Sequence, residues 1–130
     1  MLSLVRSDLG RRLVLGAPML VFGGIAVASA VAPHTMAEGL GYHLDNVDAL
    51  SEYRAIYVGL WAAHVVIFGL ALRRLREPIF GDLGALLILG QVVGRLVSLG
   101  LDGIPSRVLP VSAAELLGGV AILLVRPRAP

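Results

Sequence analysis

Four long apolar runs occupy most of this 130-residue chain and constrain its fold more than any other feature. A helix needs roughly 20 apolar residues, at a rise of about 1.5 Å each, to cross about 30 Å of bilayer hydrocarbon. The runs cover about residues 13–32, 55–72, 79–101 and 108–125, and none alternates in polarity as a barrel strand does. The sequence therefore predicts an all-α integral membrane protein: one domain, an antiparallel up-down four-helix bundle.

The overall composition agrees with that prediction. Hydrophobic residues make up 57% of the chain and charged residues 15%, with a mean hydropathy of +0.85. A soluble domain of this size cannot bury so much apolar surface, so we expect membrane lipid to cover it. The absence of cysteine excludes disulfides and thiolate metal sites, and no cofactor is expected.

The positions of the arginines predict the orientation in the membrane. All eleven basic residues are arginine, in short clusters beside apolar runs, which membrane topology explains better than nucleic-acid binding. Those expected on the cytoplasmic side are Arg6, Arg11, Arg12, Arg73, Arg74, Arg76, Arg126 and Arg128. The opposite loops hold Arg54, Arg107, Glu38, Asp45, Asp48, Glu52 and Asp102. We therefore expect both termini to be cytoplasmic, in a bacterial inner membrane.

Two further expectations concern the first helix and the glycines. Arg11-Arg12 before an apolar run is also typical of a signal peptide, but a run of about 20 residues exceeds the usual 7–15, so we expect this helix to be retained. The segment 33–52 is long enough for a short interfacial helix. The glycines expected where helices approach closely are Gly84, Gly90, Gly94, Gly118 and Gly119.

Ionisable side chains within the apolar runs carry most of the functional information, because each costs a few kcal/mol in a bilayer unless it is paired or reaches water. Arg95 lies seven residues before Asp102 at the outer turn, and Glu115 lies seven residues after Val108. Antiparallel packing places both at a similar depth. We predict an Arg95–Glu115 ion pair about 10 Å below the outer surface.

Helical spacing extends this pair to a larger candidate site. Polar and aromatic residues at i, i+3 or i+4, and i+7 share one helix face. On the third run this stripe is Gln91, Arg95, Ser98 and Asp102, and on the second it is Arg54, Tyr57, Trp61 and His64. If these stripes and Glu115 all point inward, they line one polar cavity that opens outside.

Each candidate residue also has a simpler interpretation. A buried Arg–Glu pair often only fixes the register of two helices. Arg54 is expected to reach the interface, and Tyr57 and Trp61 are expected as packing or interfacial aromatics. His64 has no neighbouring metal ligand, so no metal site is predicted. The sequence offers no nucleophile paired with a base, which argues against an enzyme.

The polar segments together resemble a known family. Glu52-x-Arg54-Ala55-x-Tyr57, Gly94-Arg95-x-x-Ser98, Asp102-Gly103-x-Pro105-Ser106 and Glu115-Leu116 resemble the bacterial membrane proteins grouped as domain-of-unknown-function family 4345. The resemblance covers nearly the whole chain and implies the same four-helix layout with a retained first helix. It implies no reaction.

Two functions therefore remain open. One is a binding or carrier protein for a small amphipathic or lipid-like molecule, with Arg95 meeting an anionic or carbonyl group and Glu115 balancing the charge. The other is a structural or accessory subunit, in a homo-oligomer or a larger membrane complex, whose ion pair serves only stability. Proton-coupled export is disfavoured because small multidrug transporters carry their acid in the first helix, which is uncharged here.

Overall fold

The structure is a computed structural model that describes residues 7–104 and 108–127. Those residues form helices joined by short turns and contain no strand, which confirms the all-α prediction. The elements are α2 (Asp8–Val31), α3 (Pro33–Gly39), α4 (Val47–Arg54), the π-helical segment η1 (Ala55–Leu60), α5 (Trp61–Arg73), α6 (Pro78–Leu101) and α7 (Leu109–Leu124).

Local chemistry explains where these helices begin. The Ser7 side chain accepts a hydrogen bond from the Gly10 amide at the start of α2, and Asn46 accepts one from the Ala49 amide at the start of α4. Such caps satisfy amides that have no partner within the helix. Helices α3 and α6 begin with Pro33 and Pro78, where a missing N–H costs nothing.

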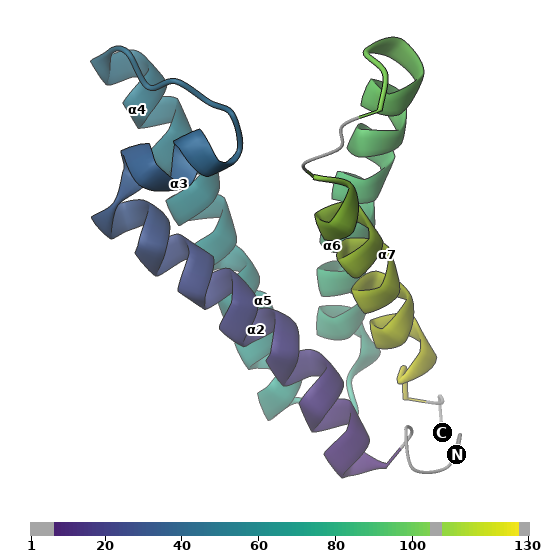
Figure 1. The fold of residues 1–130 in the computed structure, drawn as a ribbon. Helices are drawn as coiled ribbons and strands as arrows, with labels where there is room; N and C mark the ends of the chain where they lie inside the picture. Colours follow the sequence, from purple (N-terminus) through teal and green to yellow (C-terminus); the bar gives the residue numbers. More distant parts are fainter. Residues whose placement is uncertain (1–6, 105–107, 128–130) are drawn as a thin grey trace.

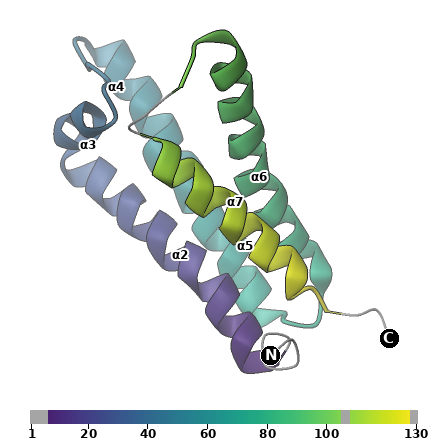
Figure 2. The same cartoon turned by 45° about the vertical axis from the view of Figure 1, so that its right-hand side comes forward.

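The long helices form two antiparallel pairs. Helix α2 packs along α5, and α6 packs along α7, while α5 also packs against α6 (Figure 1). The pairs approach each other near the α5–α6 turn and separate towards α3 and α4 (Figure 1). In the turned view of Figure 2, α7 crosses in front of α5, and it also contacts α2. The apolar core that joins them contains Leu15, Phe22, Phe68, Ala71, Leu75, Ala85, Ile88 and Ile122.

Three helical stretches within the described residues are long and apolar enough to cross a membrane: Asp8–Val31, Val47–Arg73 and Pro78–Leu101. They include the first three predicted spans. The second begins eight residues earlier than predicted, because the Asn46 cap starts α4, which continues through η1 into α5. Helix α7 has 16 residues and is therefore about 24 Å long, shorter than the predicted run 108–125. The predicted short helix in segment 33–52 is α3.

The glycine prediction is correct at two positions and wrong at three. A Cβ at Gly84 would lie 2.6 Å from the Phe68 ring, and one at Gly119 would lie 2.6 Å from Leu89. Added Cβ atoms at Gly90, Gly94 and Gly118 would meet nothing within 4 Å. Those three do not face a neighbouring helix, because α6 and α7 each contact their neighbours over only part of their surface.

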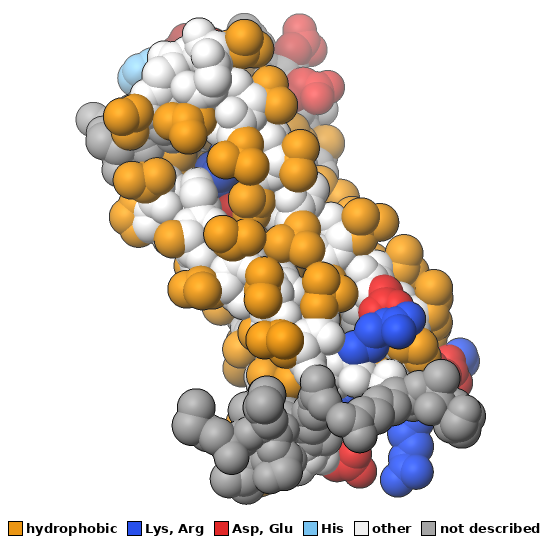
Figure 3. Space-filling view, turned by 90° about the vertical axis from the view of Figure 1, so that its right-hand side faces the viewer, with side chains coloured by type: hydrophobic (Ala, Val, Ile, Leu, Met, Phe, Trp, Pro, Cys, Tyr) orange, Lys and Arg blue, Asp and Glu red, His pale blue; other side chains and the backbone are white. Residues whose placement is uncertain are grey.

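The surface is apolar over its middle and charged towards its ends. Figure 3 shows apolar side chains covering most of the α6–α7 face. Large exposed side chains include Leu20 at 73%, Leu117 at 71% and Val93 at 59%. A continuous apolar surface of this kind is typical of a protein covered by lipid or by another protein.

Candidate functional site

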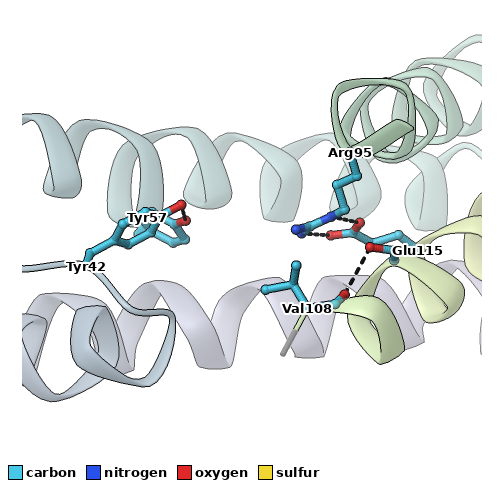
Figure 4. A network of polar contacts seen from close by, with 6 residues as sticks. Tyr42, Tyr57, Arg95, Val108 and Glu115 are labelled. Carbon is cyan, nitrogen blue, oxygen red and sulfur yellow. Dashed lines mark hydrogen bonds and ion pairs between the residues drawn. The ribbon is translucent and has the colours of Figure 1, made fainter. Parts of the chain in front are cut away.

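The central feature of the site is a two-point contact between Arg95 of α6 and Glu115 of α7 (Figure 4). Arg95 Nε donates to Glu115 Oε2 at 2.8 Å, and Arg95 Nη2 donates to Oε1 at 2.9 Å. The Glu115 side chain is 8% exposed and that of Arg95 is 29% exposed. The contact predicted from equal depth on two antiparallel helices is therefore formed, with the carboxylate as its more buried partner.

A second pair of the same geometry joins the other ends of these helices. Arg126, just after α7, donates from Nε and Nη2 to the Asp82 carboxylate of α6, with Nη2 at 2.9 Å from Oδ2. These hydrogen bonds and the charge of Asp82 raise the pKa of the Arg126 guanidinium. The sequence did not predict this pair, because Asp82 and Arg126 lie near the ends of their apolar runs, where charged side chains can reach water. The antiparallel register of α6 and α7 was the available signal. Moving from Arg95 back along α6 leads to Asp82, and moving from Glu115 forward along α7 leads to Arg126.

Aromatic side chains form a continuous wall on α4, η1 and α5. The ring of Tyr57 stacks on that of Tyr53 at 4.5 Å and on that of Trp61 at 5.7 Å between centroids. Tyr57 also donates a hydrogen bond of 3.4 Å to the Tyr42 hydroxyl, and Tyr53 shares one of 3.2 Å with Ser29 of α2. We call Tyr53, Tyr57 and Trp61 the aromatic wall. π-Helical turns such as the one that carries Tyr57 occur often at functional sites.

Arg95 of α6 and Tyr57 of the aromatic wall lie on different helix pairs. In Figure 4 the guanidinium extends from α6 towards the side on which Tyr57 lies. Arg95 uses two of its five N–H donors on Glu115, and the others donate to no residue that the structure describes.

Among the described residues, none of the remaining predicted site residues bonds to Arg95 or Glu115, although the His64 ring lies 6.4 Å from that of Trp61. His64 is buried among apolar side chains, with Nδ1 at 2.8 Å from the Leu60 carbonyl, and its ring lies 4.8 Å from that of Phe22. Ser98 donates to Asp102 at 2.9 Å near the end of α6, and that bond is exposed. Arg54 is exposed at the end of α4, and Gln91 is half-buried one turn from Arg95. In the part of the chain described, no three His, Asp or Glu side chains could hold a metal ion.

Two residues of the site were not predicted as such. Tyr42 lies in a segment predicted as a loop, and Tyr53 lies before the predicted start of the second span. The spacing Tyr53, Tyr57, Trp61 was the available signal, since residues four apart lie on one face of a helix.

The fold and these contacts define a class: an all-α protein with helices fit to cross a membrane and a largely buried Arg–Glu contact between two of them. The chain belongs to the family described as domain of unknown function DUF4345, whose profile matches residues 11–126. The family resemblance drawn from the sequence is thereby confirmed. No curated protein and no solved structure matches the chain.

Proposed function

We propose that this protein crosses the bacterial inner membrane four times, with both termini cytoplasmic, and binds a small amphipathic molecule between the aromatic wall and Arg95. The polar group of that molecule, anionic or carbonyl, would accept hydrogen bonds from Arg95. Its apolar part would lie against Tyr57 and Trp61. The proposal has a topological part and a chemical part.

The topological part is supported by α7 and by the charges at the helix ends. Although α7 is about 24 Å long, it is apolar apart from Ser112 and Glu115, and it is tied to α6 by one arginine–carboxylate pair near its middle and another just after its end. A short span is accommodated by local thinning of the bilayer at modest cost. Among the described residues, the arginines gather at the end of the α5–α6 turn, as expected for a cytoplasmic surface.

The chemical part rests mainly on one observation: Arg95 donates only two of its five N–H groups to Glu115. Its buried partner Glu115 neutralises the charge, so the pair can lie within a membrane at a tolerable cost. The Arg95 side chain is 29% exposed, and its donors outside the pair lack an acceptor among the described residues. A guanidinium that is held in place, neutralised and still able to donate is suited to recognise one polar group of an otherwise apolar ligand.

The alternative is an accessory or scaffolding subunit in which the pair only locks α6 to α7. The apolar α6–α7 face favours this reading, since a partner protein could cover it as well as lipid. Under this alternative the space beside Arg95 holds no specific molecule.

Native mass spectrometry of the gently extracted protein separates the two functions. We expect the wild type to carry a small-molecule adduct, and Arg95→Gln to retain it about tenfold less or weaker still, because charge-assisted hydrogen bonds contribute about 1.5–3 kcal/mol. Tyr57→Leu leaves the ion pair intact and should also lose the adduct. Arg126→Gln, which breaks the second pair, is the matched control and should keep it.

Two results would contradict the binding function. One is that the wild type carries no adduct that Arg95→Gln and Tyr57→Leu lose. The other is a stoichiometric protein partner with no small molecule, which would support the accessory subunit.

A further inference from the structure

A second polar site lies at the opposite end of the molecule from α3. Side chains from the start of α2 and from the α5–α6 turn surround a surface depression of about 300 Å³. The residues that line it are Asp8, Arg12, Arg73, Arg74, Leu75, Arg76 and Glu77. We call this the arginine depression. It has four arginines against two carboxylates.

Among the described residues, most of the arginines in the depression form no ion pair. Arg74 pairs with Glu77 at 3.3 Å, and both side chains are more than half exposed, at 54% and 55%. No ion pair holds Arg12, Arg73 or Arg76 among the described residues. Arg11, which precedes Arg12 in the chain, is 7% exposed, and its Nε has no hydrogen-bond partner among the described residues. A concentration of unpaired guanidinium groups attracts a polyvalent anion, and guanidinium geometry suits phosphate.

The surroundings of the depression favour a lipid over a free anion. Leu9 and Leu13 lie within one turn of Arg12 on α2, and they are 67% and 65% exposed. Ile79, at the start of α6, is 54% exposed. The arginines therefore lie at the boundary between charged and apolar surface, where the phosphates of a bilayer lie next to its acyl chains. A ligand there can bind through its phosphate and continue along apolar helix surface.

We propose that the arginine depression binds the phosphate headgroup of an anionic phospholipid. Basic pockets at the cytoplasmic ends of membrane helices recognise such headgroups. The inference uses the membrane topology proposed above, but it does not depend on a ligand at Arg95. It gives the arginines a recognition role in addition to setting orientation.

The test is lipid binding to the full-length protein in detergent, followed by native mass spectrometry. Phosphatidylglycerol and phosphatidylcholine of equal chain length are the two probes. The wild type should bind phosphatidylglycerol about tenfold or more better than phosphatidylcholine, since each arginine near a headgroup adds substantially to anionic-lipid binding. The triple variant Arg73→Gln/Arg74→Gln/Arg76→Gln should lose that preference. Arg126→Gln removes an arginine at the same end that Asp82 already binds, and it should keep the preference.

A second variant separates headgroup recognition from simple charge. Arg73→Lys/Arg74→Lys/Arg76→Lys preserves the charges that set topology, yet it should bind phosphatidylglycerol less well than the wild type, because lysine cannot form two parallel hydrogen bonds to phosphate. This variant also tests the proposal if the glutamine variant does not accumulate. An excess of inorganic phosphate should not displace the lipid.

The proposal is overturned if the wild type binds both lipids equally, if the glutamine variant keeps the preference, or if inorganic phosphate displaces the lipid, which would indicate a free-phosphate site. An adduct lost in Arg95→Gln and kept in the triple glutamine variant belongs to the Arg95 site, and an adduct with the reverse behaviour belongs to the arginine depression, so either proposal can fail alone.

Discussion

At the scale of single residues, the two arginine–carboxylate pairs differ in surroundings much more than in geometry. Both use Nε and Nη2 of the arginine, but the side chains of Arg95 and Glu115 are 29% and 8% exposed, whereas those of Arg126 and Asp82 are 53% and 32% exposed. Breaking a buried pair leaves one desolvated charge without its partner, whereas an exposed pair is replaced by water. The pairs should therefore respond differently to the same change.

We predict that Arg95→Ala and Glu115→Ala each lower the free energy of unfolding by about 3–5 kcal/mol, as for other buried pairs that lose one partner. The double variant Arg95→Met/Glu115→Leu should recover most of this loss, because no buried charge is left. Arg126→Ala should stay close to the wild type. Denaturant unfolding in detergent measures the free energy of unfolding of all four variants. Equal losses for Arg95→Ala and Arg126→Ala would contradict the claim that the Arg95–Glu115 pair is the more buried of the two.

The contact between Arg95 and Glu115 was predictable from the sequence, because the two residues lie at the same depth on neighbouring helices. The direction in which side chains point around the second helix was not predictable. Arg95 and Glu115 lie equally far from the turn that joins their helices, so antiparallel packing alone predicts their contact. The predicted stripe on the second helix assumed regular α-helical rotation, whereas the segment around Tyr57 is π-helical. Tyr57 and Trp61 belong to the aromatic wall, and Trp61 and His64 both pack against Phe22 of the core, with ring centroids 4.9 and 4.8 Å from it.

At the scale of elements, close helix contact is concentrated at two glycines. Gly84 lets α6 approach the Phe68 ring of α5, which is fully buried and 6.2 Å from the parallel ring of Phe22. Because Phe22 and the rest of the core surround that ring, it has little room to move away from an added methyl group.

Gly84→Ala should therefore lower the free energy of unfolding by about 1–2 kcal/mol, the cost of overpacking less the gain in helix propensity. Gly90→Ala is the matched control on the same helix, because its Cβ would meet nothing within 4 Å, and it should be neutral or slightly stabilising. Thermal unfolding of the two variants side by side measures this. A less stable Gly90→Ala would show that α6 is packed differently.

Element boundaries were predictable for helices bounded by proline and less so elsewhere. The third span was predicted within one residue, because Pro78 fixes the start of α6. The second was predicted too short, because α4 is polar and its helical character depends on the Asn46 cap and on contact with the remainder of the structure.

At the scale of the whole molecule, the proposed function requires that α7 crosses the bilayer beside α6, because only then does the Arg95–Glu115 pair lie within the membrane. The arginine depression requires only that the start of α2 and the α5–α6 turn lie on the cytoplasmic side. The chain contains no cysteine, so single cysteines introduced at exposed positions report topology without interference.

The most direct measurement is labelling of such cysteines in intact cells with a maleimide that does not cross the inner membrane. We predict that Thr35→Cys and Asp45→Cys react from outside, whereas Glu77→Cys and Pro127→Cys react only after the membrane is permeabilised. Reaction of Pro127→Cys from outside, with Glu77→Cys still protected, would mean that α7 does not cross the membrane as proposed and would contradict the account.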